Sequence, residues 1–419
     1  MDRPPARQGR LRSQPQKCVG PQIRSRMTDL LEGIWQRGRD LLPVAGFGFD
    51  RPLVLFQSDD WGRVGVRDQE GWDELQSAGL TLGERAYDFY TLETAADLEQ
   101  ITALLTKHRD STGRHPCLGM NFIVFNLDFA KMRAAGFQQI ELLPLSKGLP
   151  QGWNRPGLFE SYREGIANGL FRPALHGITH FCRSAVERHL AENGDKVALL
   201  RTFWQASTPY IYWRMPWIGY EYLDPGKSGS EQFLSRDLQR ELIGPAVGEL
   251  ARIFSTLPRS ACAPGYRANA DTHRAWAQHG IRIAQNGPGA PMPPYIDRHA
   301  ILQLTRTVEF EPAADEAFSV DRSLQQAEAC FQQGLPAIVS IHSINFHSTL
   351  RDFRSRTLNA LDEFLTALES KHNDLLYLHD EDIYQLINRG AYGTSVGTTR
   401  VNVMKRSFTK SRLLKRGTQ

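Results

Sequence analysis

The sequence predicts an α/β fold in which the strands of a mostly parallel sheet or barrel alternate with helices. Short apolar, β-branched runs bounded by turn residues recur along the chain, as the strands of such a fold do. Segments with the 3.6-residue periodicity of amphipathic helices lie between these runs. The runs expected to form strands are 53–56, 118–125, 173–175, 281–284, 301–304, 337–341 and 375–378.

The expected helices are justified by their apolar stripes. In the segment 352–370, one face of a helix carries Leu358, Leu361, Leu365 and Leu368, which indicates a helix that packs on the core. Comparable patterns occur in the segments 93–108, 184–206, 230–254 and 321–333.

Two irregular segments interrupt the alternation. Residues 144–159 are rich in Gly and Pro, and residues 208–229 contain six Tyr and Trp side chains around three prolines. Long irregular insertions are functional loops or disordered linkers, and so many aromatic side chains favour an ordered one. Because Tyr and Trp faces stack on sugar rings, this aromatic insertion fits a carbohydrate substrate; a small separate core under a long loop explains it equally well.

The two ends of the chain differ from its body in composition. We expect a disordered basic tail over residues 1–26, a helical segment over 27–45, the β/α domain over 46–390 and a basic C-terminal tail over 391–419. Residues 1–26 also lack the apolar stretch of a secretory signal. Together with five scattered cysteines and no CxxC pair, this favours a cytoplasmic protein.

The formal charge of +4 conceals an acidic body. Residues 1–26 and 400–419 together hold 14 of the 50 basic groups and one of the 46 acidic groups, so the rest of the chain carries 36 basic and 45 acidic groups, a net charge of −9. Such a body does not present the clustered basic face that nucleic-acid binding requires. The sequence also contains no apolar run long enough for an integral membrane helix.

The first expected strand leads directly into the sequence QSDDWG, which contains Asp59 and Asp60. The carboxyl ends of barrel strands are where such folds carry their functional groups. Two adjacent carboxylates repel each other unless a cation is bound, and a metal held by one of them leaves the other as a base. A solvated turn in which one acid caps a helix is the alternative.

Histidines follow two other expected strands. The sequence PALHGITH places His176 at a strand end and His180 in the next turn, so that both imidazoles can share a divalent ion with Asp60. The sequence AIVSIH brings His342 to the same edge, where it could protonate a leaving amine. Taken alone, each of these is more often a surface or structural histidine. Their combination with the acid pair favours a metal site.

The ordered set QSDDWG, HGITH, CAPGYR and IVSIHS resembles the motifs of the polysaccharide deacetylases of the NodB-homology superfamily, over about residues 50–390. The resemblance implies a distorted, mostly parallel (β/α) barrel with seven strands. It also implies a metal-dependent hydrolase that removes an N-acyl group, with acetyl expected, from a sugar or polysaccharide.

The resemblance further implies a role for each matched residue. Asp59 is the expected base, and His342 is the expected acid. Asp60, His176 and His180 are the expected ligands of a divalent metal, with Zn²⁺ the expected ion.

The sequence departs from the family pattern at three points. Gly177 stands where the family has Ser or Thr after the first metal-binding histidine. The Arg of the family motif Arg-x-Pro is missing, because the motif aligns with Cys-Ala-Pro at residues 262–264. We expect Arg267 to replace it beside Asp59. The acid that orients His342 is not evident, and Asp380 in the sequence LHDED is one candidate.

Other functions fit parts of the pattern. An amide hydrolase for a small non-sugar substrate would use the same groups, whereas a glycosidase needs two carboxylates that face each other across a bond, unlike the adjacent Asp59 and Asp60. A glycan-binding relative that lost turnover with the motif arginine belongs to a different class. The deciding observation is whether Arg267 or another guanidinium contacts Asp59.

Overall fold

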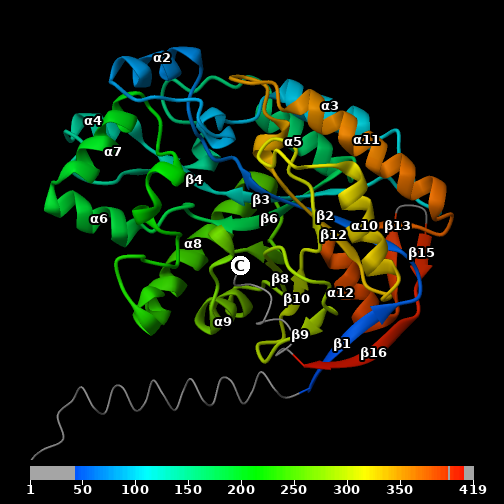
Figure 1. The fold of residues 1–419 in the computed structure, drawn as a ribbon. Coiled ribbons are helices and arrows are strands. Elements are labelled where there is room, and N and C mark those ends of the chain that lie inside the picture. The colour runs from blue at the N-terminus through cyan, green and yellow to red at the C-terminus, as the bar shows by residue number, and fades with distance from the viewer. Residues whose placement is uncertain (1–42, 395–396, 410–419) are drawn as a thin grey trace, which may run out of the picture. The chain divides into compact units, whose positions relative to one another are not determined.

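The computed structural model describes residues 43–394 and 397–409 of the 419-residue chain. Most of the contacts among these residues fall within one unit, Ala45–Arg406. The expected tail 1–26 and nearly all of the expected helical segment 27–45 lie outside the described residues. The unit Ala45–Arg406 contains nearly all of the described residues (Figure 1).

One large sheet of twelve strands forms the centre of this unit. The strand order is β11-β12-β2-β3-β6-β7-β8-β10-β9-β1-β16, and β13 also pairs with β2. All pairings from β11 to β10 are parallel, and so is that of β13 with β2, whereas β9 pairs antiparallel with β10 and β1. The strands are β1 (Pro43–Phe49), β2 (Leu53–Trp61), β3 (Leu118–Ile123), β6 (Phe171–Gly177), β7 (Ser260–Cys262), β8 (Ile283–Asn286), β9 (Tyr295–Ile296), β10 (Leu302–Thr305), β11 (Val308–Glu309), β12 (Ala337–His342), β13 (Leu376–Leu378) and β16 (Val403–Thr409).

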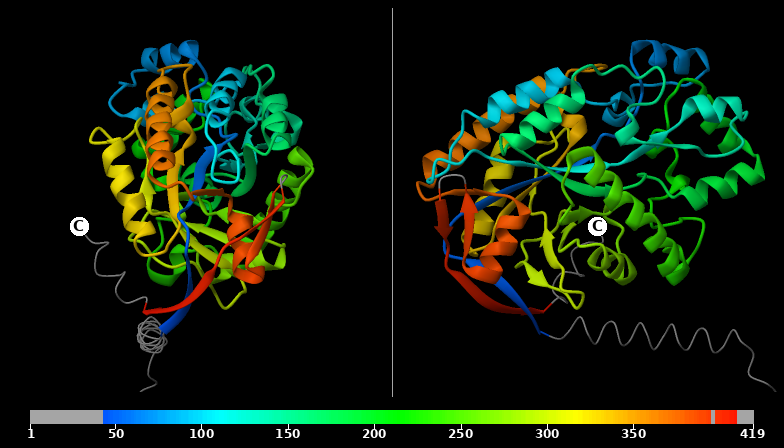
Figure 2. Two further views of the ribbon diagram at one scale, coloured as in Figure 1. Left: turned by 90° about the vertical axis from the view of Figure 1, so that its right-hand side faces the viewer. Right: turned by 180° about the vertical axis from the view of Figure 1, so that it is seen from behind.

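Helices pack around the sheet and against one another. α3 lies beside α5 and α11, α8 beside α9, and α10 beside α11 (Figure 2). The helices are α2 (Gln69–Ser77), α3 (Ala95–Leu105), α4 (Phe129–Ala134), α5 (Leu158–Ala167), α6 (Arg183–Glu192), α7 (Asp195–Gln205), α8 (Arg236–Phe254), α9 (Ala270–Gln278), α10 (Val320–Phe331), α11 (Arg354–Lys371) and α12 (Asp380–Arg389). Among the described residues, none of these helices is long and apolar enough to cross a membrane.

The predicted α/β fold with a curled, mostly parallel sheet is confirmed, and each of the seven predicted runs overlaps a strand. The sheet has more strands than seven because short strands add to it. β7 has three residues and β11 has two, which is too short for a periodic pattern to reveal them.

Residues 391–409, expected as part of a basic tail, also contain strands. β14 (Ala391–Thr394) and β15 (Gly397–Arg400) form an antiparallel pair, and β16 follows them. Tyr392 and Val401 are buried in the apolar cluster that contains Leu53 and Leu55. Buried apolar side chains thus extend the ordered unit beyond the boundary expected at residue 390.

The core has two apolar clusters on opposite faces of the strands. In β2, Leu53 and Leu55 belong to one cluster, while Val54 and Phe56 belong to the other. Burial on both faces explains why this strand is a continuous apolar run in the sequence. Because side chains alternate along a strand, Asp59 continues the face of Leu53 and Leu55.

A polar layer follows the apolar one on the face that carries Leu55. Gln57, Gln285 and Ser340 are buried, and each stands two residues beyond an apolar member of the same cluster on β2, β8 or β12. Arg306 follows Leu304 of β10 in the same way. The sequence therefore directs polar side chains toward the carboxyl ends of the strands, where the site lies.

Candidate active site

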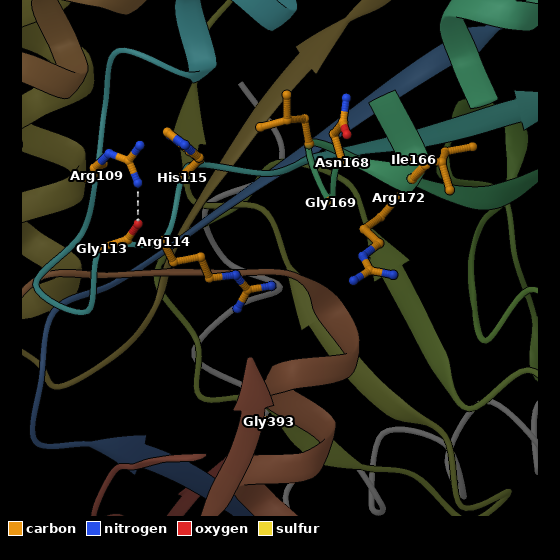
Figure 3. Close-up of a pocket in the computed structure, with 11 residues that line it drawn as sticks. Arg109, Gly113, Arg114, His115, Ile166, Asn168, Gly169, Arg172 and Gly393 are labelled. Carbon is orange, nitrogen blue, oxygen red and sulfur yellow. Dashed lines mark hydrogen bonds between the residues drawn. The ribbon is translucent and has the colours of Figure 1, made fainter. Parts of the chain in front are cut away.

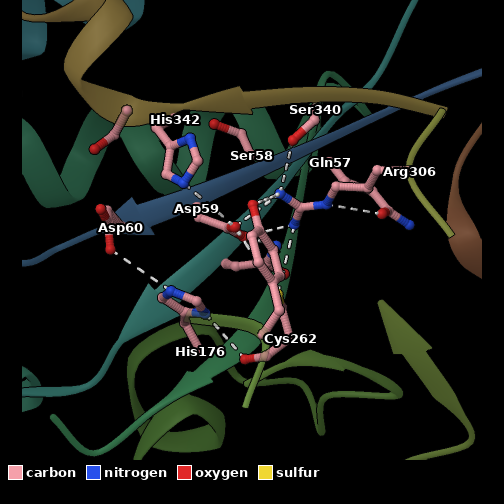
Figure 4. Close-up of polar contacts among 12 residues, drawn as sticks. Gln57, Ser58, Asp59, Asp60, His176, Cys262, Arg306, Ser340 and His342 are labelled. Atoms are coloured by element: carbon pink, nitrogen blue, oxygen red, sulfur yellow. Dashed lines mark hydrogen bonds and ion pairs between the residues drawn. The ribbon is translucent and has the colours of Figure 1, made fainter. Parts of the chain in front are cut away.

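Asp59, Asp60, His176 and His342 meet at one edge of the sheet (Figure 4). Asp59 and Asp60 lie near the end of β2, and His176 lies near the end of β6. His342 is the last residue of β12 and stands opposite Asp59 in the parallel register. The parallel arrangement thus brings residues that are 283 positions apart in the sequence into one site.

A local irregularity in β2 separates the directions of the two acids. The pairing of β2 with β3 shifts register between Ser58 and Trp61, and Asp60 has φ = 75°. This left-handed conformation costs a residue other than glycine about 1–2 kcal/mol. The Tyr90 hydroxyl donates to the Asp60 carbonyl oxygen at 2.7 Å. As a result, Asp59 meets the Arg306 guanidinium, while Asp60 Oδ1 faces two imidazoles and Asp60 Oδ2 accepts from Arg63 Nη2 at 3.0 Å.

Asp60, His176 and His180 form a cluster whose spacing fits one divalent cation. Asp60 Oδ1 lies 3.6 Å from His176 Nε2 and 3.4 Å from His180 Nε2, and it is buried without a hydrogen-bond partner. Two ligands of a tetrahedral zinc ion lie about 3.4 Å apart, because each is about 2.1 Å from the metal. The donor set and its spacing therefore fit a metal site.

The imidazoles of His176 and His180 both turn Nε2 toward Asp60 Oδ1. His176 Nδ1 lies 2.9 Å from the Cys262 carbonyl oxygen. Since a carbonyl only accepts, His176 Nδ1 donates a proton to it, and this bond fixes the ring with Nε2 as the nitrogen that faces Asp60. Burial lowers the pKa of His180 to about 3, against the opposing charge of Asp60.

A second group of three possible ligands, Asp59, His176 and Cys262, is less suited to a cation. Both carboxylate oxygens of Asp59 already accept hydrogen bonds from Arg306. Burial and the charge of Asp59 raise the pKa of the Cys262 thiol well above its ordinary value, so it stays protonated. A thiol binds metal as the thiolate, so the cluster around Asp60 is the better metal site.

Asp59 is held by a buried arginine that was not expected from the sequence. Arg306 donates from Nη1 to Asp59 Oδ2 at 2.7 Å and from Nη2 to Oδ1 at 2.6 Å. Burial by itself would raise the pKa of Asp59, but the adjacent guanidinium holds it well below its usual range. Asp59 is therefore ionised.

The expectation for Arg267 is not met. This residue is exposed, and no hydrogen bond or ion pair between its side chain and Asp59 occurs in the part of the chain that the structure describes. Arg267 follows the short 3-10 helix η6 (Pro264–Tyr266), outside the sheet. Arg306 instead continues the inward face of β10, and this difference decides which guanidinium reaches Asp59.

The buried polar layer of the sheet holds Arg306 in place through hydrogen bonds. Arg306 donates to Gln57 Oε1 at 3.2 Å and to Gln285 Oε1 at 3.1 Å. The amide groups of these two glutamines donate in turn to Asp380, at 2.8 and 2.7 Å. Asp380 was a candidate partner of His342. It instead binds the two glutamines that contact Arg306, and no contact joins it to His342 among the described residues.

The acid beside His342 is Glu311. Glu311 Oε1 lies 2.6 Å from His342 Nδ1, and its other oxygen accepts from Asn345 Nδ2 at 2.6 Å. Burial alone would lower the pKa of His342, but the charges of Glu311 and Asp59 raise it to about 9. His342 Nε2, 3.8 Å from Asp59 Oδ2, therefore carries a proton at neutral pH.

Arg306 and Glu311 were not predicted as site residues, and only Arg306 could have been recognised from a pattern in the sequence. Arg306 comes two residues after the predicted strand 301–304, so it is a charged residue at a strand end, like Asp59. Glu311 follows β11, which was not predicted. In the register of β11 and β12, Glu309 lies opposite Ser340, which places Glu311 level with His342.

The glycine in HGITH is explained by a carboxylate of the aromatic insertion. Gly177 has φ = +116°, and a Cβ there would lie 1.9 Å from Glu221 Oε2. Glu221 Oε1 accepts from the Ile178 amide at 2.8 Å. The insertion thus braces the turn between His176 and His180, and Ser or Thr at position 177 would collide with Glu221.

A cavity of about 250 Å³ lies over these groups. Besides the carboxylates and imidazoles, its lining is mainly aromatic, and four of the aromatic residues belong to the segment 208–229. The aromatic side chains are Tyr87, Tyr90, Tyr210, Tyr212, Trp213, Tyr220 and Tyr266. The aromatic insertion therefore forms a wall of the candidate site.

A second cavity, of about 570 Å³, differs in chemistry and position (Figure 3). Arg109, Arg114 and Arg172 line it together with His115, and no carboxylate or second histidine is among its lining residues. It lies beside the amino ends of β3 and β6, whereas the candidate site lies at their carboxyl ends. Of these two cavities, only the smaller one is lined by carboxylates together with several histidines.

His347 is buried away from the cavity. Its Nε2 lies 3.4 Å from Glu93 Oε2, and its ring contacts Tyr90 at 4.9 Å between centroids. It does not line the cavity that contains His342.

No protein-family model and no curated protein matches the sequence. Among solved structures, the chain is similar to a protein from Mycobacterium smegmatis assigned to the polysaccharide deacetylases, with a TM-score of 0.41 and 12% identity over 81% of this chain and 91% of that one. It is also similar to a family 4 carbohydrate esterase from Streptomyces lividans, with a TM-score of 0.33 and 12% identity over 77% and 90% of the two chains. A CE4 family pseudoenzyme from Bacillus anthracis has a TM-score of 0.34 and 10% identity, over 78% and 63%. The activities of those proteins are their own.

Proposed function

We propose that this protein is a metal-dependent hydrolase that removes an N-acyl group, acetyl in the first place, from an amino sugar. The observation that carries the proposal is the meeting of three units in one cavity: a possible metal-ligand cluster, an ionised carboxylate and a protonated histidine. Each unit has its own supporting contact from Cys262, Arg306 or Glu311.

Asp60, His176 and His180 would hold the cation. Two nitrogen ligands and one carboxylate are typical of catalytic zinc sites, which favours Zn²⁺. When bound, the ion supplies a Lewis acid that acidifies water and stabilises negative charge on the acyl oxygen. The Asp60 oxygen without a hydrogen-bond partner supports this assignment.

Asp59 and His342 would move the protons of the hydrolysis. Asp59 accepts the proton of the water that attacks the acyl carbon, and His342 donates its proton to the nitrogen as the C–N bond breaks. The products are a carboxylate and a free amine on the sugar. The two side chains face each other at 3.8 Å and are in the protonation states that these steps need before the reaction.

The contact between Arg306 and Asp59 also bears on the non-catalytic alternative. That alternative depended on the loss of the motif arginine, but a guanidinium is present on the proposed base. This contact supports a catalytic role over the non-catalytic alternative. The aromatic lining favours a sugar over a small non-sugar amide, since Tyr and Trp faces stack on sugar rings.

The test is acetate release from N-acetylated saccharides by the zinc-loaded protein, together with metal analysis. Asp59→Asn should lower kcat by several orders of magnitude and keep about one zinc per chain, because Asp59 is not a ligand. His176→Ala should lose both zinc and activity. Absence of acetate release from every saccharide by the zinc-loaded wild type would refute the proposal.

A further inference from the structure

The rim of the candidate site is closed on the side where the aromatic insertion meets the segment around Tyr87. Tyr87 and Trp213 both line the cavity, although they are 126 residues apart. Asp88, next to Tyr87, accepts from Trp213 Nε1 at 2.9 Å and from Arg214 Nε at 3.0 Å. These bonds join the two segments into one wall.

Asp88 is well suited to fix this wall. It is fully buried, and Arg214 Nη2 donates to its second oxygen at 3.0 Å. The same oxygen accepts from the amide groups of Gly83 and Glu84, at 3.0 and 2.9 Å. A carboxylate with this many donors holds both segments in place.

The rim continues through the insertion to the other side of the site. Tyr212 and Tyr220 stack with their ring centroids 4.7 Å apart, and the His180 ring contacts both of them. Tyr220 in turn packs on Gly265, where a Cβ would lie 2.3 Å from its ring. Stacked rings therefore enclose the side of the cavity that holds the metal ligands.

The two ends of this wall reach the acid and the base. The Tyr87 ring contacts the His342 ring at 6.4 Å between centroids. Next to Gly265, the Tyr266 hydroxyl accepts from Arg306 Nη1 at 3.1 Å, and Arg306 holds Asp59. Contacts between neighbouring side chains thus run around the site from His342 to Asp59.

The closed rim limits the size and shape of the substrate. A chain that is attacked at an internal residue needs a groove that is open on two opposite sides, because the chain must enter and leave. The cavity of 250 Å³ is also smaller than the range of about 300–1,000 Å³ that is usual for ligand pockets. It offers room for one sugar ring and not for a row of them.

We propose that the site accepts a single N-acylated amino-sugar residue that is free or stands at the end of a chain, and not a residue inside a polymer. The inference rests on the proposed function, since it concerns the substrate of the same site. It has a stoichiometric consequence. Deacetylation does not shorten the chain, so an enzyme restricted to one end removes one acetyl group per chain, whatever the length.

The experiment measures total acetate released from β-1,4-linked N-acetylglucosamine oligomers of two to six residues by the zinc-loaded protein. We expect the release to stop at one acetate per chain for every length, and tandem mass spectrometry to place the free amine on a terminal residue. A plateau that rises with chain length, or free amines inside the chain, would overturn the inference while leaving the proposed function intact.

Two tryptophan variants test the role of the wall. Trp213→Ala removes the one of the two side chains bonded to Asp88 that also lines the cavity, and it should raise the plateau above one acetate per hexamer. Trp217→Ala is the matched control, because Trp217 belongs to the same insertion but does not line the cavity and contacts His189 instead. It should keep the plateau at one. A plateau of one in both variants would show that the Trp213 wall does not restrict the substrate, and would overturn this part of the inference.

Binding separates failure of this inference from failure of the proposed function. In zinc-loaded Asp59→Asn, calorimetry should give dissociation constants for the dimer and the hexamer that agree within about twofold, because only one residue is enclosed. An affinity that increases with each added residue would indicate an open groove and overturn the inference. If the oligomers bind with equal affinity but the wild type releases no acetate, the proposed hydrolase activity is refuted and the proposed single-residue binding site is supported. If none of the oligomers binds, the proposed single-residue binding site is refuted as well.

Discussion

Replacing Glu311 by Gln should remove the charge that keeps His342 protonated. Burial lowers the pKa of His342, but Glu311, 2.6 Å from Nδ1, and Asp59 raise it to about 9. Gln has the size of Glu and keeps one acceptor oxygen for the His342 imidazole, while its NH2 group takes the place of the oxygen that accepts from Asn345. The variant therefore changes the charge beside His342 with little change in shape.

The size of the effect follows from the two pKa values. Without Glu311, burial acts with less opposition, so the pKa of His342 should fall to about 6.5, its ordinary value, or below. At pH 8, a group with a pKa of about 9 is about 90% protonated, and one with a pKa of about 6.5 is about 3% protonated. Acid catalysis by His342 should therefore fall about thirtyfold at pH 8.

The sign of the pH dependence is fixed by the need for a protonated acid. Activity that depends on His342 is present at low pH and is lost as the pH rises through its pKa, near 9 in the wild type and near 6.5 in Glu311→Gln. The stabilisation from this ion pair has the same direction: it is complete below about pH 6.5 and is lost as the pH rises through about 9. A bound cation would lower the pKa of His342 in both proteins, so the difference between them is the quantity to compare.

The assay is the pH profile of kcat/KM for acetate release by zinc-loaded wild type and variant. Glu309→Gln is the control, because Glu309 is an exposed residue of the same short strand. An alkaline limb at the same pH in wild type and Glu311→Gln would refute the role of Glu311, and a shift in Glu309→Gln would show that the effect is not local.

Two further predictions concern single positions of the site. His342→Ala should damage amide hydrolysis far more than hydrolysis of an activated aryl ester, because only the poor amine leaving group needs a proton, and equal losses on both substrates would refute the acid role; His347→Ala should have the smaller effect on amide hydrolysis. Gly177→Ala should lower the free energy of unfolding by at least about 1 kcal/mol and weaken zinc binding, because of the left-handed φ and the collision with Glu221, as measured by thermal unfolding and metal titration; an unchanged zinc affinity would contradict the role of Glu221 as a brace.

The sequence was sufficient for the residues whose position depends on one strand alone. Asp59, Asp60, His176 and His342 each end or follow an apolar run, and parallel strands bring such ends to one edge. Their meeting in one cavity needed only the correct fold class. The same holds for His180, which lies one turn beyond His176.

The supporting residues could not be found in this way, because they depend on which strands are neighbours. Glu311 stands beside His342 only because the two-residue strand β11 pairs with β12. Arg306 reaches Asp59 because its strand lies next to β8 in the curled sheet. Arg267 was expected beside Asp59 from its closeness to residues 262–264 along the sequence, but the chain turns outward there and leaves its side chain exposed.

In this chain a cysteine, Cys262, stands where the motif has its arginine, and Arg306 provides the guanidinium from another strand. Cys262 occupies the position of the motif arginine in the resemblance, and its Sγ lies 3.6 Å from Arg306 Nη2. The small thiol leaves the space that the guanidinium from β10 fills. Only one guanidinium fits beside Asp59, whichever of the two positions provides it.

Cys262→Arg should therefore be inactive and destabilised, since it places a second cation in a filled and buried space. Arg306→Ser should also lose activity, and removing one partner of a buried ion pair costs about 3–5 kcal/mol of stability. The double variant Cys262→Arg/Arg306→Ser should be more active and more stable than either single variant, because it restores one guanidinium to Asp59. Its loss of stability should therefore be smaller than the sum of the losses in the two single variants. Arg267→Gln, at an exposed position, should stay close to the wild type. Thermal unfolding and acetate release on all four variants measure this, and a double variant no better than Arg306→Ser would show that the two positions are not interchangeable supports of the same carboxylate.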